Sequence, residues 1–151
     1  MYLFKKSSYL SAFILSFLMA FSVSLNASSD DFTDEQIKGF ASAVTQIMNI
    51  QQQSQMQMIQ VIEEYEMDVQ RFNLLYMQMQ QMPIDEIDGT DKEKEDMAEI
   101  VEEIENIQHE IESVVIGTIE DEGLTIEVYE AIMTAYQQDP ELQQRIQQEM
   151  E

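Results

Sequence analysis

Residues 33–82, which begin TDEQIKGFASAVTQIM and end NLLYMQMQQM, decide the fold. Apolar side chains recur along them at steps of three and four, which is the period of an amphipathic helix and not of a strand. The stripe consists of two blocks: Ile37, Phe40, Ala41, Val44, Ile47 and Met48, then Met58, Val61, Ile62, Tyr65, Val69, Phe72, Leu75, Tyr76, Met79 and Met82. No proline interrupts the pattern before Pro83, so we predict one long helix over about residues 34–82.

The start of this helix carries a capping box inside a hydrophobic staple. Thr33 can accept a hydrogen bond from the backbone N–H of Gln36, whose side chain can reach back to the N–H of Thr33. Phe32 and Ile37 flank the box and are placed to pack across it. Between the two apolar blocks the stripe becomes polar, and residues 51–55 read QQQSQ. We interpret this gap as a handover between two packing partners or as a hinge.

Residues 1–27 have the three parts of a secretory signal peptide. Lys5 and Lys6 supply positive charge, residues 10–23 supply an apolar core, and residues 25–27 (LNA) supply an imperfect cleavage site. The apolar core is shorter than the ~20 residues that a membrane-spanning helix needs. We therefore expect a cleaved signal rather than a retained anchor. The mature chain, residues 28–151, would be a single helical domain exported to the periplasm or secreted.

The chain of 151 residues carries a formal net charge of −23 at pH 7. Such a charge repels nucleic-acid phosphate and anionic membrane surfaces, so we expect no binding to either. The chain contains no cysteine, which excludes disulfides and thiol chemistry. The acidity suits an environment of high salt, and ordinary solubility charge explains it equally well.

Three shorter helices follow the long one, each opened by a local start signal. The signals are a capping box at residues 90–93 (TDKE), Thr125, and Asp139 followed by Pro140. Gly123 is placed as the left-handed C-cap of the first of these helices. The predicted helices lie at about residues 34–82, 91–122, 126–137 and 140–150, with no strand.

The second helix carries a seven-residue apolar repeat, the pattern of coiled-coil packing. The repeat consists of Met97, Ile100, Ile104, Ile107, Ile111, Val114 and Thr118. A short loop joins the two long helices, so we expect a long antiparallel helical hairpin, coiled-coil-like in its packing. The second helix reaches only to about residue 50 of the first. The two short C-terminal helices should therefore pack on the N-terminal part of the first helix.

The two-helix section of this hairpin buries little apolar surface. Each large apolar side chain contributes about 1.5–3 kcal/mol on burial, whereas ordering the backbone costs about 1–2 kcal/mol per residue. We therefore expect a homodimer that completes a four-helix bundle. The competing interpretation is a monomer in which the C-terminal pair folds further along the hairpin.

Three segments resemble one protein family. FTDEQ at residues 32–36, EGLTIEVY at residues 122–129 and DPELQQRI at residues 139–146 are together similar to an exported bacterial family, catalogued as domain of unknown function 4168. The resemblance is loose in the middle of the chain, and Val128 stands where an acidic residue is expected. It implies an exported helical domain and brings no known activity or catalytic residue. In size, location and helicity the chain is also similar to small periplasmic helical chaperones of the envelope-stress type.

The sequence offers little for catalysis or for hard metal ions. His109 is the only histidine, and it lies on the outer side of the second helix among glutamates. Carboxylate pairs such as Glu102 and Glu103 fall opposite the apolar stripe, where solvation prevents the shifted pKa that acid–base catalysis needs. In the acidic loop, Ile84 holds the position where a calcium loop requires a carboxylate. We expect no enzymatic activity and no cofactor.

Methionine is unusually abundant, with twelve residues in the chain. Met56, Met67 and Met77 fall off the apolar stripe, and we predict that they form an adaptable surface for an unknown protein partner. This would make the protein a scaffold or a chaperone-like binding protein of the cell envelope. The alternative is a periplasmic Cu(I)-binding protein that uses the thioethers of Met77, Met79 and Met82. Against it, Met79 and Met82 lie on the core stripe, where methionine usually fills space.

Overall fold

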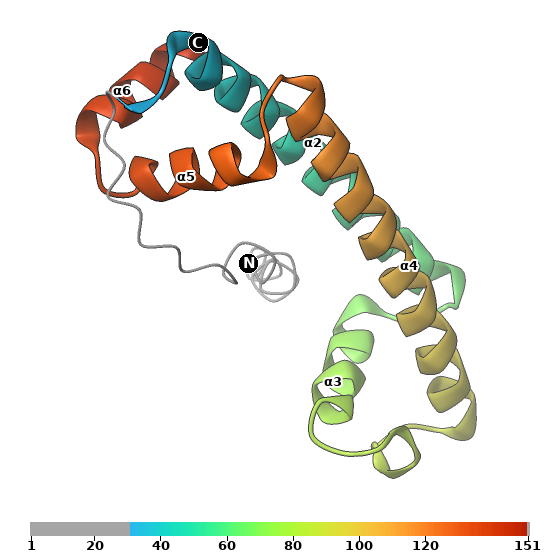
Figure 1. The fold of residues 1–151 in the computed structure, drawn as a ribbon. Coiled ribbons are helices and arrows are strands. Elements are labelled where there is room, and N and C mark those ends of the chain that lie inside the picture. Colours follow the sequence, from blue (N-terminus) through green and yellow to red (C-terminus); the bar gives the residue numbers. More distant parts are fainter. Residues whose placement is uncertain (1–30, 151) are drawn as a thin grey trace, which may run out of the picture. The chain divides into compact units, whose positions relative to one another are not determined.

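The computed structural model describes residues 31–150 and is all-helical over them (Figure 1). The elements are α2 (Asp34–Glu64), α3 (Val69–Met79), the 3-10 helix η3 (Ile84–Glu86), α4 (Asp91–Asp121), α5 (Ile126–Tyr136) and α6 (Pro140–Glu149). The predicted all-α class is confirmed for this part of the chain. The predicted signal at residues 1–27 lies outside the described residues. Within residues 31–150, no helix is long and apolar enough to cross a membrane.

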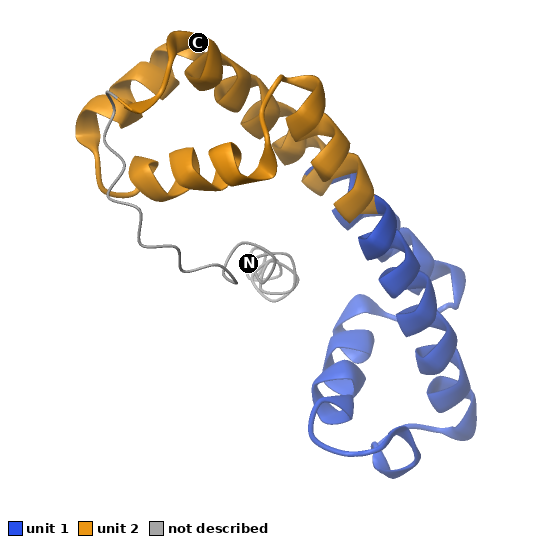
Figure 2. Cartoon of the chain, in the orientation of Figure 1, with its two compact units in different colours: residues 1–19, 52–110 blue, residues 20–51, 111–151 orange. Residues whose placement is uncertain are grey.

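The chain divides into two compact units (Figure 2). Of the described residues, unit 1 contains 52–110 and unit 2 contains 31–51 together with 111–150. Both α2 and α4 contribute one end to each unit. The boundary within α2 falls at the start of the polar gap in its apolar stripe, although the helix itself runs through residues 51–55 without a break.

The core of unit 2 packs α5 and α6 against the N-terminal part of α2. The rings of Phe40 and Tyr129 lie with their centroids 5.0 Å apart, and Ile132 and Leu142 are fully buried. The core cluster consists of Phe32, Ile37, Phe40, Ala41, Ala43, Ile47, Ile119, Leu124, Tyr129, Ile132, Ala135, Leu142 and Ile146. The apolar residues of α5 and α6 therefore pack against the apolar stripe of α2, as expected from the sequence.

The predicted start signals form the hydrogen bonds that define them. The N–H of Gln36 donates to Thr33 Oγ1 at 3.2 Å, and the N–H of Thr33 donates to Gln36 Oε1 at 2.9 Å. In the same way, Thr90 and Glu93 exchange hydrogen bonds of 2.7 and 3.2 Å at the start of α4. The remaining caps are Thr125 for α5 and Asp139 for α6.

The end of α4 is a Schellman motif. Gly123 has a φ of 76°, a left-handed conformation that glycine adopts without steric penalty. Its N–H donates to the carbonyl of Glu120 at 2.9 Å, and the N–H of Leu124 donates to the carbonyl of Ile119 at 3.2 Å. Leu124 is buried in the core of unit 2. The predicted C-cap thus turns the chain from α4 into α5.

The prediction of one helix over residues 34–82 is wrong, because the chain turns between α2 and α3. Glu66 has a left-handed backbone with a φ of 56°. The N–H of Glu66 donates to the carbonyl of Glu63 at 2.9 Å, and the N–H of Met67 donates to the carbonyl of Ile62 at 3.2 Å. Hence α2 ends with the same pair of hydrogen bonds as α4, with a glutamate where α4 has a glycine.

A start signal for α3 follows this turn directly. Asp68 Oδ1 accepts hydrogen bonds from the backbone N–H groups of Gln70 at 2.8 Å and Arg71 at 3.3 Å. Met67 and Phe72 stand at the two positions that a hydrophobic staple joins around such a cap, and both are buried. The cap and the staple are both present in the sequence, but apolar residues keep helical spacing across them, and that spacing predicted a single helix.

Unit 1 buries one side of α3, of the end of α2 and of the start of α4. Ile87, in the loop after η3, is also buried, and Leu75 packs close to Gly89 of the same loop. The buried apolar residues of unit 1 are Met58, Ile62, Met67, Phe72, Leu75, Ile87, Met97, Ile100 and Ile104.

Candidate functional site

The outer side of α3 presents an uncharged and partly apolar line to solvent. Gln70, Leu74 and Met77 follow one another at steps of four and three, which places them along one side of the helix, and Gln81 follows in the turn after the helix ends at Met79. Leu74 is 49% exposed and Met77 is 61% exposed. These four residues are termed the α3 face. Among the described residues, two large apolar side chains one turn apart are therefore exposed on the same side of α3.

Arg71 fastens α3 to the start of α4. Its Nε donates to Glu93 Oε1 at 2.7 Å and its Nη2 donates to Oε2 at 3.1 Å, so the pair is bidentate. Nη2 also donates to the carbonyl of Asp88 at 2.7 Å. The guanidinium of Arg71, together with the backbone N–H of Thr90, lowers the pKa of the Glu93 carboxyl from 4.5 to about 2. This ion pair thus holds α3, on which the α3 face lies, against the start of α4.

Carboxylates lie around the α3 face, although α3 itself contains none. Asp68 caps the N-terminal end of the helix. Near the other end, the backbone N–H of Asp88 donates to Gln78 Oε1 at 2.6 Å, which brings the acidic loop beside the helix. On another side of α3, where Tyr76 stacks on Phe72, burial and the nearby charge of Glu105 raise the pKa of the Tyr76 phenol. Negative charge therefore lies at the N-terminal end of the apolar line, at Asp68, and alongside α3, at Asp88.

A second tyrosine–glutamate contact closes the turn between α2 and α3. Tyr65 Oη donates to Glu103 Oε1 at 2.7 Å. This hydrogen bond, with burial and the charge of the carboxylate, raises the pKa of Tyr65. Glu103 was expected to be solvated, and it is half-buried beneath this contact. A phenol with a raised pKa keeps its proton at neutral pH, so the pair stabilises the turn and supplies no general base.

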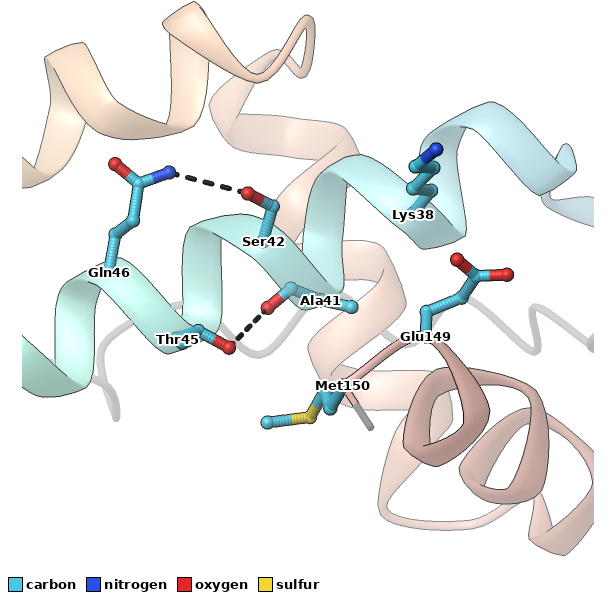
Figure 3. Close-up of a pocket in the computed structure, with 7 residues that line it drawn as sticks. All are labelled: Lys38, Ala41, Ser42, Thr45, Gln46, Glu149 and Met150. Carbon is cyan, nitrogen blue, oxygen red and sulfur yellow. Dashed lines mark hydrogen bonds between the residues drawn. The ribbon is translucent and has the colours of Figure 1, made fainter.

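An open depression of about 370 Å³ lies in unit 2 (Figure 3). Side chains of α2 and the end of α6 line it: Lys38, Ala41, Ser42, Thr45, Gln46, Glu149 and Met150. Ser42 Oγ and Gln46 Nε2 both donate to Oε1 of Glu122, at 2.8 and 2.6 Å. These hydrogen bonds join α2 to the end of α4. No histidine lines the depression, so the Ser42 hydroxyl has no imidazole beside it to activate it as a nucleophile.

One comparison with known proteins gives a match. Residues 83–146 match the model of a family described as Domain of unknown function (DUF4168). That segment belongs to the DUF4168 family. It includes the resembling stretches at residues 122–129 and 139–146 but not the one at residues 32–36. No curated protein and no solved structure matches the chain.

The DUF4168 segment begins after α3 and includes part of its acidic border. Asp88 lies within the segment, whereas the α3 face, residues 70–81, precedes it. His109 also lies within the DUF4168 segment and is exposed, as predicted. Among the described residues, no group of three or more histidines, aspartates or glutamates could hold a metal ion.

The three methionines predicted to bind a partner do not share one environment. Met56 is 63% exposed on α2, and Met77 lies on the α3 face. Met67 is only 6% exposed, so its predicted role at a partner surface is wrong. Helical spacing put Met67 on the outer side, but it lies in a turn and packs inward. Leu74 was not predicted from the sequence, in which its three-residue spacing from Met77 was the available signal.

The methionines of the Cu(I) alternative do not converge on one side of α3. Met77 and Met79 are two residues apart on a helix, which turns their side chains to nearly opposite sides. Met79 is half-buried, and Met82 follows the end of the helix with 37% exposure. Their positions do not make a ready set of three sulfur ligands.

Proposed function

We propose that this protein acts by binding another protein through the α3 face and catalyses no reaction. Its role would be that of an exported scaffold or chaperone-like component of the cell envelope. The observation that carries the proposal is the joint exposure of Leu74 and Met77 on one uncharged helix side. Contiguous apolar surface is what partner-binding sites present, and methionine adapts its shape to different partners.

The polar groups of the described residues favour binding over catalysis. Thr33, Thr90, Thr125 and Asp139 are used as helix caps. Tyr65, whose pKa is raised, is held as a protonated hydrogen-bond donor. A catalytic site needs a nucleophile or an acid–base group with a shifted pKa beside a space for substrate. The depression in unit 2 offers space without such a pair.

The test compares two double variants of the purified protein. Leu74→Gln with Met77→Gln removes the apolar part of the α3 face. Met48→Gln with Met150→Gln is the matched control, because these residues are 59% and 45% exposed in unit 2. The assay measures how far each protein suppresses the aggregation of a model client, reduced α-lactalbumin.

Wild type and control should delay the aggregation, and the α3-face variant should lose most of that effect. All four substitutions are at exposed positions, so circular dichroism should show unchanged helicity. If the α3-face variant protects the client as well as the wild type does, the α3 face is not the binding surface and the proposal fails.

The alternative function is Cu(I) binding by Met77, Met79 and Met82. In its favour, Met77 and Met82 are both exposed and close in sequence, and thioether sulfur is a soft ligand that suits Cu(I). Anaerobic titration of the protein with Cu(I) separates the two functions. Tight stoichiometric binding that disappears when all three residues are changed to leucine would favour the metal carrier. Absence of binding, with client protection retained in the wild type, would favour the protein-binding role.

Export and self-association complete the proposal. The signal-like residues 1–27 support export to the periplasm or beyond, which cell fractionation with an antibody against the protein would test. The wide apolar stripes of the sequence support a homodimer. Light scattering coupled to size-exclusion chromatography measures the mass in solution, and a monomeric mass at high protein concentration would exclude the dimer.

A further inference from the structure

The α3 face has the dimensions of a contact for one helix. The helix that carries it, α3 (Val69–Met79), is about 16 Å long at 1.5 Å per residue. The two apolar side chains, Leu74 and Met77, stand in its middle with a glutamine on either side. A narrow apolar ridge of this kind suits the apolar stripe of an amphipathic helix, which meets it through residues at steps of three and four.

The charge around this ridge selects among partners. Asp68 caps the N-terminal end of α3, and Asp88 lies alongside α3, where its backbone contacts both Arg71 and Gln78. Arg71 is the only basic residue of α3, and its guanidinium is paired with Glu93. A partner that brings carboxylates or phosphates to this surface would meet like charge, which is destabilising.

We infer that the partner of the α3 face is a cationic amphipathic helix of another protein, an inference that rests on the proposed function. Its apolar stripe packs on Leu74 and Met77. Lysine or arginine side chains beside that stripe point toward Asp68 and Asp88. Apolar contact supplies the affinity, and the acidic border supplies selectivity and a faster association rate.

Three labelled synthetic peptides of about 18 residues test this inference. The first has an apolar stripe of leucines at helical spacing with flanking lysines, and the second has glutamate in place of every lysine. The third has the composition of the first in an order that forms no apolar stripe. Fluorescence anisotropy measures the affinity of each peptide for the purified protein and for its variants.

The first peptide should bind at least tenfold more tightly than either of the others, and its affinity should fall as salt is added. Changing Leu74 and Met77 to glutamine should abolish its binding, whereas the Met48→Gln, Met150→Gln control should retain it. Changing Asp68 and Asp88 to asparagine, which keeps a capping side chain at position 68, should weaken binding about two- to tenfold. The matched charge control, Glu120→Gln with Glu130→Gln in unit 2, should leave the affinity unchanged.

The outcomes distinguish a failure of this inference from a failure of the proposed function. Equal binding of the cationic and acidic peptides, lost in the Leu74→Gln, Met77→Gln variant, would overturn the inference and leave the proposed function standing. Equal binding of the first and third peptides would overturn the inference, because attraction would then depend on charge alone. If the α3-face variant binds the first peptide and protects clients as the wild type does, both fail.

Discussion

Replacing Glu66 would test the turn that separates α2 from α3. Glu66 has a φ of 56°, and a left-handed backbone costs a residue with a Cβ atom roughly 1–2 kcal/mol. Glycine avoids that strain but loses about 0.4–1 kcal/mol through the greater freedom of the unfolded chain. We therefore expect Glu66→Gly to stabilise unit 1 by about 0.5–1 kcal/mol.

Glu66→Ala is the control that isolates the backbone term. Both substitutions remove the carboxylate, and with it the attraction that Glu66 exerts on Lys92. Alanine keeps the Cβ atom and so keeps the strain, which should leave it about 1 kcal/mol less stable than glycine. In an uninterrupted helix the order would be the opposite, with alanine about 1 kcal/mol more stable than glycine.

Urea unfolding followed by far-ultraviolet circular dichroism measures the difference, since the chain has no tryptophan to serve as a probe. The two units can unfold at different urea concentrations, so the transition that responds to both substitutions is the one to compare. A glycine variant less stable than the alanine variant would refute the turn at residue 66. It would restore the single helix that the apolar spacing predicts.

Three further predictions concern packing and charge. A Cβ at Gly39 would stand 2.6 Å from the carbonyl oxygen of Glu122, so Gly39→Ala should destabilise the protein by about 1–3 kcal/mol in the same urea assay. A Cβ at Gly117 would have no neighbour within 4 Å, so Gly117→Ala should stabilise the protein by up to about 1 kcal/mol. Phe40→Ala should cost about 3–5 kcal/mol through the cavity left in the core of unit 2, and a calorimetric loss below 1 kcal/mol would contradict that packing. Because the pKa of Glu93 is lowered from 4.5 to about 2, its contribution to stability is complete above pH 4.5 and is lost as the pH falls to about 2. Urea midpoints measured from pH 7 to pH 2 should fall further in that window for the wild type than for Glu93→Gln, and parallel profiles would count against the ion pair.

Helix starts could be predicted from the sequence because their chemistry is local. Thr33 and Gln36, or Thr90 and Glu93, lie three residues apart and satisfy each other's backbone groups whatever the rest of the chain does. The left-handed C-cap at Gly123 is equally local. Such signals survive in any fold that keeps the helix.

The turn between α2 and α3 could not be predicted from periodicity. Ile62, Tyr65, Val69 and Phe72 keep helical spacing across it, and neither glycine nor proline marks it. Glu66 adopts a strained conformation that the surrounding packing and the cap at Asp68 impose. The same turn buried Met67, which a continuous helix would have exposed.

Periodicity also identifies which side of a helix is apolar without saying how much of that side is covered. Met48 and Val114 lie on the predicted stripes, yet they are 59% and 46% exposed. Leu74 and Leu75 are neighbours of identical type, and only the packing of α3 decides that Leu75 is buried and Leu74 is not. The structure was therefore needed to locate the candidate site, although Met77 at its centre was predicted from the sequence.

The limits of the family match and the limits of the folded units do not coincide. Residues 83–110 of the match fall in unit 1 and residues 111–146 in unit 2, and it contains neither unit completely. A recombinant fragment trimmed to the match would carry Tyr129 without Phe40, the ring against which it packs. Expressed alone, such a fragment should aggregate or be degraded, so biochemical work on this protein needs a chain that begins before Phe32.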